Sequence, residues 1–179
     1  ANPRLQILDD IVSTLEGITT ASGYNNTVQK VVKGKIILRE MMAVSKLSAF
    51  CSVKYAGQTN QIEGPFTASG SDMMQASSEY LIYASMDLCT NTTFLGFLDD
   101  IEAALAKRPD RNSIIGAQGE YKVMDSFVTQ ISEPDTSGEH DEVVDDSSEQ
   151  HKFLACFIRF SVIYYYIPHY LSGGFTGGI

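Results

Sequence analysis

Histidines and carboxylates, the side chains that bind divalent metal ions, gather in one stretch near the C-terminus of this chain. Glu139, His140, Asp141 and Glu142 are consecutive, and His151 follows after a short gap. A closed metal site needs ligands that a rigid frame holds in a fixed geometry. The spacing here is irregular and the surrounding residues are those of a charged loop, so we interpret the stretch as a solvated acidic segment without a metal.

Two other groups have chemically active side chains. Asp99 and Asp100 form a carboxylate pair, but adjacent residues of a helix lie about 100° apart and do not face each other. A solvated helix face is the prediction for both. In Tyr164-Tyr165-Tyr166, strand alternation turns Tyr165 away from the other two rings, which favours core and interface packing over a ligand-stacking platform.

Motifs of nucleophilic catalysis and of phosphate binding do not occur in the sequence. It contains no G-x-S-x-G, no G-x-x-x-x-G-K-[ST] and no G-x-G-x-x-G. We therefore expect neither an enzyme nor a cofactor. Two alternatives from other classes stay open: a cytoplasmic metal-dependent hydrolase that uses His140, His151 and nearby carboxylates, and an adaptor that binds an extended peptide along an edge strand.

Bulk properties limit the class of protein. The 179 residues, 44% of them hydrophobic, are enough for one domain, and we expect a domain over residues 1–171 with a flexible Gly-rich tail over 172–179. The net charge of -9 argues against binding to a nucleic-acid backbone. Cys51, Cys89 and Cys156 are far apart and odd in number, which indicates a reducing compartment. We find neither a signal peptide nor a membrane span.

Two helices are predicted. Asn2 as the N-cap and Pro3 at the first helical position begin a helix that runs to Glu16 and carries apolar residues at helical spacing. The second begins at an Asn91/Thr92 cap and ends at Lys107, with its acidic residues on the outside.

Five strands and their connections follow from alternation and from turn-type residues. The segment 34–46 fits either a strand or a helical turn, and 56–70 reads as a long surface connection. The predicted fold class is α+β, with two helices packed on a mostly antiparallel sheet and a long C-terminal β-hairpin that carries an acidic loop. The predicted strands are 27–33, 48–55, 78–88, 119–132 and 153–167.

The two last strands form this hairpin, and each arm would reach roughly 45 Å at about 3.3 Å per residue. From Phe153 to Ile167 only Arg159 and Ser161 are neither apolar nor aromatic, so this strand is predicted to be buried on both faces. A hairpin longer than its own core requires suggests a neighbouring subunit. The candidate interface or lumen residues are the acidic ones of the loop together with two of the strand: Glu133, Asp135, Glu139, Asp141, Glu142, Asp145, Asp146, Glu149, Arg159 and Tyr165.

A family resemblance rests on several of these segments. The opening helix from Ile7 to Thr20, the Gly23-Tyr24 turn, the helix Phe97-Leu98-Asp99-Asp100-Ile101-Glu102-Ala103-Ala104-Leu105 and the final strand ending in three tyrosines resemble the tail-terminator proteins of long-tailed bacteriophages. The departures are the connection between Gly57 and Gly70, the size of the acidic loop and the Gly-rich tail.

The resemblance implies a virion protein of the tail or neck, assembled in the host cytoplasm, that forms a ring, usually hexameric. Such a ring caps the tail tube, stops its polymerisation and provides the docking surface for the head connector. The implied partners are further copies of the chain, the tail tube protein and the head–tail connector or stopper protein, while DNA passes through the lumen without specific binding. The family has no catalytic residues, and the runner-up is another neck or tail ring component: a head-closure, tail-completion or tube protein.

Overall fold

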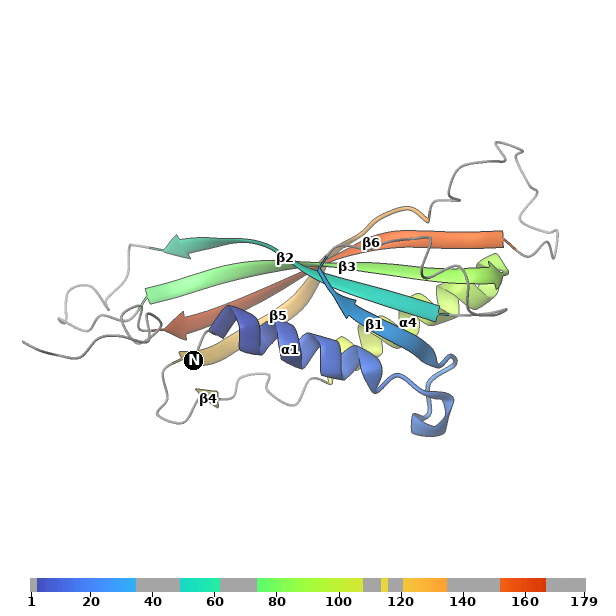
Figure 1. Cartoon of the computed structure of the whole chain (residues 1–179). Coiled ribbons are helices and arrows are strands. Elements are labelled where there is room, and N and C mark those ends of the chain that lie inside the picture. Colours follow the sequence, from blue (N-terminus) through green and yellow to red (C-terminus); the bar gives the residue numbers. More distant parts are fainter. Residues whose placement is uncertain are drawn as a thin grey trace, which may run out of the picture.

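The computed structural model describes residues 3–34, 49–61, 74–107, 114–115, 121–134 and 152–166 (Figure 1). Several predictions lie outside these residues: nearly all of the undecided segment 34–46, the later part of the 56–70 connection, the acidic loop after Pro134 and the tail 172–179. The described elements form an α+β structure, as predicted from the sequence.

The sheet has five long strands and one strand of two residues in the described part. Its order is β1-β2-β3-β6-β5-β4, and every pairing is antiparallel except that of β1 with β2, which makes the sheet mixed. The bounds are Val28–Lys33 for β1, Ala49–Gln61 for β2, Met74–Cys89 for β3, Ile114–Ile115 for β4, Tyr121–Ile131 for β5 and Lys152–Tyr166 for β6.

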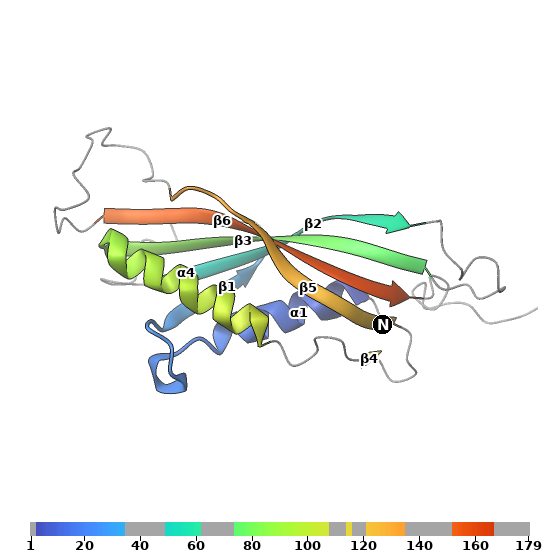
Figure 2. The same ribbon diagram turned by 180° about the vertical axis from the view of Figure 1, so that it is seen from behind.

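Both α-helices lie on the same face of this sheet (Figures 1 and 2). α1 spans Pro3–Glu16, as predicted, and buries apolar residues at helical spacing against β1 and β2. α4 spans Asn91–Ala106 and contacts β3 and β5. Its N-cap is Thr90, whose hydroxyl accepts a hydrogen bond from the backbone N of Thr93, and not the predicted Asn91/Thr92. A short 3-10 helix, Thr20–Ser22, precedes β1.

The core lies between the helices and the sheet face that they cover. Alternate residues of the two central strands point into it, among them Tyr80, Ile82 and Ala84 on β3 and Ile158 and Phe160 on β6. These side chains are at most 1% exposed. The helix side of the sheet is thus closed by residues whose spacing was visible in the sequence.

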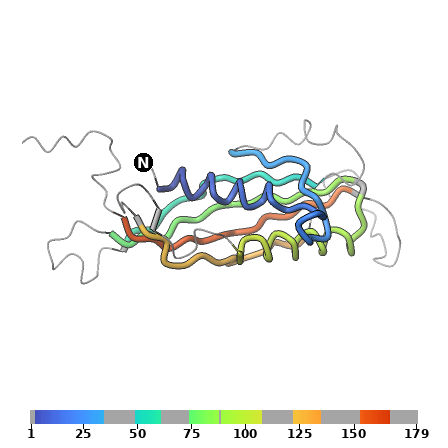
Figure 3. The backbone as a smooth tube through the Cα atoms, turned by 90° about the horizontal axis from the view of Figure 1, so that it is seen from below, coloured from blue at the N-terminus to red at the C-terminus, as the bar shows by residue number. Residues whose placement is uncertain are grey.

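The opposite face of the sheet, which we call the open face, corrects one prediction. β6 is not buried along both faces, because Phe157 is 49% exposed and Arg159 is also exposed. Both belong to the open face, on which neither described helix packs. Figure 3 shows α1 and α4 together on the other side of the strands.

Register shifts at β-bulges alter two other strands, β2 and β5. The predicted connection from residue 56 is wrong as far as Gln61, because β2 continues past a register shift between Tyr55 and Gly57, where Gly57 takes a φ of 124°. In β5 a shift between Val123 and Asp125 reverses the alternation. Phe127 therefore lies on the open face and is 42% exposed, whereas Val123 is buried.

Candidate assembly surface

An aromatic pair stands near the middle of the open face. Tyr83 on β3 is the register partner of Phe157 on β6, and their rings are 5.0 Å apart between centroids in an edge-to-face arrangement. Edge-to-face packing fixes the ring beyond what burial alone does. Phe157 is consequently both half exposed and held in place by its neighbour.

The backbone of Phe157 is fixed as well. Its N–H donates to Oγ of Ser132 at 2.8 Å, and its carbonyl accepts from the backbone N of Ser132 at 2.8 Å. Ser132 follows directly after the end of β5, and its backbone N and its hydroxyl together take the place of a strand in this row. A rigid exposed aromatic loses little entropy on binding, which is the property of an interface anchor.

Beside this pair lies a depression of about 320 Å³, lined by Leu81, Gln130, Ser132, Phe157 and Arg159. Arg159 also forms an ion pair with Glu79, with 3.5 Å between Nη1 and Oε2 and both side chains about half exposed. An exposed pair of this kind contributes at most about 1 kcal/mol to stability. The ion pair holds Arg159 on the open face, where its side chain lines the same depression as Leu81 and Phe157.

Two strand edges carry no described partner. β1 pairs with β2 only as far as Val53, so Lys54 to Gln61 form one such edge. β4 pairs only with the first two residues of β5, so Ser126 to Ile131 form the other. An edge with unpaired N–H and C=O groups is a template for pairing with another chain.

The predicted interface residues fall into two groups. Glu133 is exposed just after β5, Arg159 lies on the open face, and Tyr165 is partly buried on the same face, opposite in direction to the buried Tyr164 and Tyr166. This confirms the predicted alternation of the three tyrosines. The remaining candidates lie outside the described residues: Asp135, Glu139, Asp141, Glu142, Asp145, Asp146 and Glu149.

Metal ligands do not gather anywhere in the part of the chain that the structure describes. His140 and His151 belong to the segments outside it. Among the described helices, none combines the length and apolar character that crossing a membrane requires.

Asp100 is a residue whose role the sequence reasoning missed. Its carboxylate is 3% exposed and accepts four hydrogen bonds from the turn before β1, so the prediction of a solvated face is wrong for Asp100, although Asp99 is exposed. The donors are the backbone N and Nδ2 of Asn25, at 2.9 and 3.0 Å, and the same atoms of Asn26, at 2.8 and 3.2 Å. The only sequence signal is the adjacent pair of asparagines after Gly23-Tyr24.

A second polar cluster lies under the first turn of α1. Oε1 of Gln58 accepts hydrogen bonds from Nε of Arg4 at 2.8 Å, from Oγ of Ser78 at 3.1 Å and from the hydroxyl of Tyr164. The bulge at Gly57 turns Gln58 toward the helices. Burial raises the pKa of the Tyr164 phenol, and the hydrogen bond with Ser78 opposes this shift. Every one of these contacts is with the chain itself, so we assign the cluster to stability.

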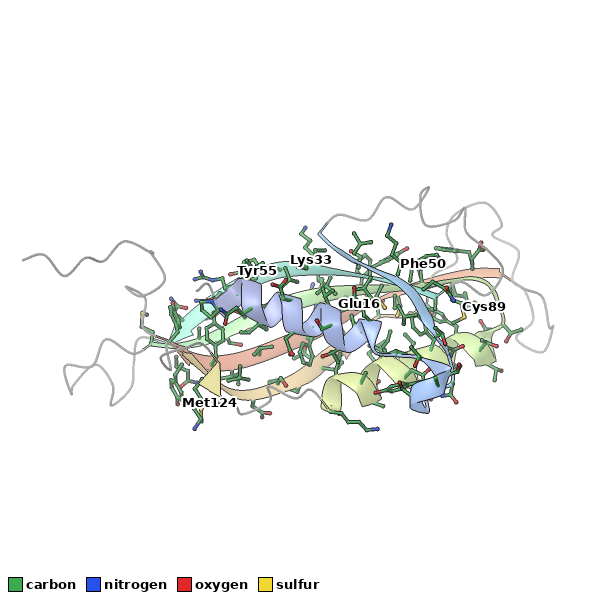
Figure 4. All side chains as sticks on the ribbon, turned by 60° about the horizontal axis from the view of Figure 1, so that its bottom comes forward. Glu16, Lys33, Phe50, Tyr55, Cys89 and Met124 are labelled. Carbon is green, nitrogen blue, oxygen red and sulfur yellow. The ribbon has the colours of Figure 1, made fainter. Side chains whose placement is uncertain are left out.

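The N-terminal edge strand is tied to the helix above it. Lys33 on β1 forms an ion pair with Asp9 on α1, and both side chains are about half exposed (Figure 4). Tyr55, farther along β2, lies on the helix side with its ring 5.9 Å from that of Tyr80. The ion pair between Lys33 and Asp9 therefore ties β1 to α1, in addition to the pairing of β1 with β2.

The three cysteines Cys51, Cys89 and Cys156 are free and buried. Cys51 and Cys156 both pair in register with Ala84. Burial raises the pKa of both thiols, that of Cys156 to about 11. At neutral pH very few of these thiols are ionised, so they are poor nucleophiles.

No protein-family model matches the sequence, and no curated protein matches it.

Proposed function

We propose that the chain is a structural virion protein, a ring-forming tail terminator that caps the tail tube, stops its polymerisation and provides the docking surface for the head connector. One observation carries the proposal: on each of the two opposite edges of the sheet, Lys54 to Gln61 on one and Ser126 to Ile131 on the other have no strand beside them in the described part of the chain, and Phe127 on the second edge is exposed. A surface of this kind is suited to contact between copies.

The position of the edges favours a ring over a simple dimer. Because the two edges differ in sequence and lie on opposite sides of the sheet, a contact between them is heterologous, with each copy using one edge toward each neighbour. Such contacts repeat from copy to copy and close into a ring when the rotation between neighbours allows it. The proposed homohexamer is one closed solution.

The resemblance to tail terminators supplies the place of the ring. The described elements include the segments that carry the resemblance: the opening helix α1, the helix α4 and the final strand β6. Eight carboxylates lie between residues 133 and 149, and a ring would multiply their charge around its axis. If these residues line the lumen, they repel DNA phosphates and let DNA pass without binding.

Electron microscopy of the assembled particle tests the proposal. We expect a closed ring of this chain at the head-proximal end of the tail tube, with the tube protein below it and the connector above. A ring at another axial position would favour the head-closure, tail-completion or tube alternatives. A strictly monomeric chain in the assembled particle would exclude the whole class.

A further inference from the structure

One end of the open face is buried, although neither described helix covers it. Phe50 on β2 pairs with Ser85 on β3, and Ser85 pairs with Ala155 on β6, so these three side chains form one row of the open face. They are at most 4% exposed, whereas Phe157, two positions farther along β6 on the same face, is 49% exposed. A layer other than the two helices therefore lies over this row.

The chain leaves β1 toward the same face. Gly34 follows directly after β1 and has a φ of 88°, in the left-handed region that favours glycine. Its N–H donates to the carbonyl of Val53 at 2.8 Å, and its own carbonyl accepts from Oγ of Ser52 at 2.7 Å. Ser52 pairs with Tyr83 and so belongs to the open face. The carbonyl of Gly34 is thus turned to the open face and back toward the start of β2.

The parallel pairing of β1 with β2 requires a crossover between them. From Gly34 to Ala49 the chain must return along the sheet by five residues, about 17 Å at about 3.3 Å per residue. Crossovers of this kind are almost always right-handed. Seen from the helix side with β2 turned to point up, β1 lies to the right of β2 (Figure 3). Seen from the open face it lies to the left, so a right-handed path from β1 to β2 passes over the open face.

We propose that residues 35–48, which lie outside the described residues, cross the open face and pack on the row of Phe50, Ser85 and Ala155. Three independent observations agree on this place: the burial of the row, the turn at Gly34 and the handedness of the crossover. The layer ends before Phe157, so the open face from that residue onward stays available to other subunits.

The sequence of the segment suits such a layer. Ile37, Met41 and Val44 recur at the spacing of one helix face, and about 11 helical residues at 1.5 Å each cover the return path. The charged residues fall on the other side of such a helix: Arg39, Glu40 and Lys46. The hydroxyl of Ser85 has no hydrogen-bond partner among the described residues, as expected beneath an apolar stripe.

Other segments fit this place less well. Gln61 and Tyr165 are both register partners of Gln75 and mark the opposite end of the sheet, so residues 62–73 and 167–179 start there. The acidic loop between β5 and β6 starts nearer to the buried row. Its carboxylates make it a poor cover, because burial of a charge against an aromatic ring without a partner is costly.

Thiol labelling in the folded chain tests which side of the segment faces the sheet. We expect M41C to react with a maleimide at least about tenfold more slowly than R39C, because a covered group reacts only after local opening. The native cysteines are buried, so they stay unlabelled while the chain is folded and report folding in the same mass spectrum. Equal rates for the two variants would overturn the proposal.

A second substitution identifies the surface beneath the segment. Phe50→Ala removes the large ring of the proposed contact, so it should raise the labelling rate of M41C severalfold. Phe157→Ala is the matched control, because Phe157 lies on the same face outside the covered row, and it should leave this rate unchanged. An M41C rate that Phe50→Ala does not alter, or that both substitutions raise equally, places the segment elsewhere.

The S85C variant distinguishes the other covers and does not depend on Phe50. Its thiol should be protected and should become reactive when residues 36–47 are replaced by a Gly-Ser linker of equal length. The same replacement of 135–149 should leave it protected. Exposure only after the second replacement would assign the cover to the acidic loop, and exposure on dilution to the monomer would assign it to a neighbouring copy. Either result overturns the proposal, and neither depends on whether the chain forms a tail-terminator ring.

Discussion

Asp100 on α4 holds Asn26, on the turn before β1, through two hydrogen bonds to the same carboxylate oxygen. The backbone N of Asn26 lies 2.8 Å from Oδ2, and Nδ2 lies 3.2 Å from it. Asn25 makes the corresponding pair of bonds to Oδ1. Because β1 begins two residues later, a buried side chain of the second helix sets where the edge strand starts.

Replacement of Asp100 by alanine should therefore destabilise the fold strongly. Hydrogen bonds to a charged group contribute about 1.5–3 kcal/mol, and four donors would lose their acceptor together, so we expect a loss of roughly 3 kcal/mol in the free energy of unfolding. Denaturant titration measures it. The exposed neighbour gives the control, since Asp99→Ala should change stability by less than about 0.5 kcal/mol. Equal effects of the two variants would refute the clamp.

Gln58→Leu should cost about 2 kcal/mol of stability, because it removes the shared acceptor of Arg4, Ser78 and Tyr164 and leaves buried donors without it. Thr59→Val is the adjacent control on the opposite side of the strand and should be nearly neutral. Thermal unfolding of both variants provides the comparison. If Gln58→Leu unfolds like the wild type, the cluster contributes little.

Alkaline pH should weaken the fold. The pKa of Cys156 rises from 9.0 to about 11 on folding, so its stabilising contribution is complete below pH 9 and is lost between pH 9 and 11, as the unfolded chain ionises first. Burial raises the pKa of Cys51 and of Tyr164 in the same direction. Unfolding free energies measured from pH 8 to 11 should change little up to pH 9 and fall between pH 9 and 11. Cys156→Ala should make the decline shallower, and an unchanged slope would contradict this origin.

Charge on the open face should block assembly without unfolding the chain. Phe157→Glu places a carboxylate at the proposed contact between copies. Because the phenyl group of Phe157 is already 49% exposed, folding should be nearly unaffected, while assembly of the ring of subunits should be lost. Leu95→Glu is the control, because Leu95 is 53% exposed on α4, which lies on the opposite face of the sheet. Sedimentation of both variants distinguishes them. Rings of Phe157→Glu at wild-type yield would remove the open face from the interface.

Neutralising the acidic segment tests its role in DNA passage. Replacement of every carboxylate from Asp135 to Glu149 by its amide keeps the length and shape of the side chains. If these residues line the lumen, packaging and ejection of DNA should slow, because the repulsion of phosphates is gone. Rings and virions should still form. Unchanged ejection kinetics would show that the charges serve solubility alone.

Local signals predicted the helices well and the strands less well. Pro3 at the first helical position and the apolar spacing predict both bounds of α1, because these signals act within a few residues, whereas the predicted cap Asn2 lies outside the described residues. The sequence predicts that this strand ends at residue 55, because Gly57, Gln58, Thr59 and Asn60 have the composition of a turn, whereas β2 continues to Gln61. Their strand conformation comes from pairing with β3, which is close in space and not in sequence.

The candidate surface depended even more on long-range structure. The exposure of Phe127 follows from a bulge that the hydrophobic pattern does not reveal, and that of Phe157 from both helices packing on one face. The sequence predicts a solvated Asp100, because the turn that binds its carboxylate lies some 75 positions away in the chain. That the last two strands are longer than one subunit requires stays a prediction, and β6 pairs along its length with β3 of the same chain.

The most direct test of the central claim is the mass of the assembled species, measured by native mass spectrometry on the chain released intact from tails or purified in bulk. A closed ring predicts one dominant mass at a fixed multiple of the 19.6 kDa chain, six for the proposed hexamer. A single peak at the monomer mass, from particles in which the chain is present, would contradict the proposal.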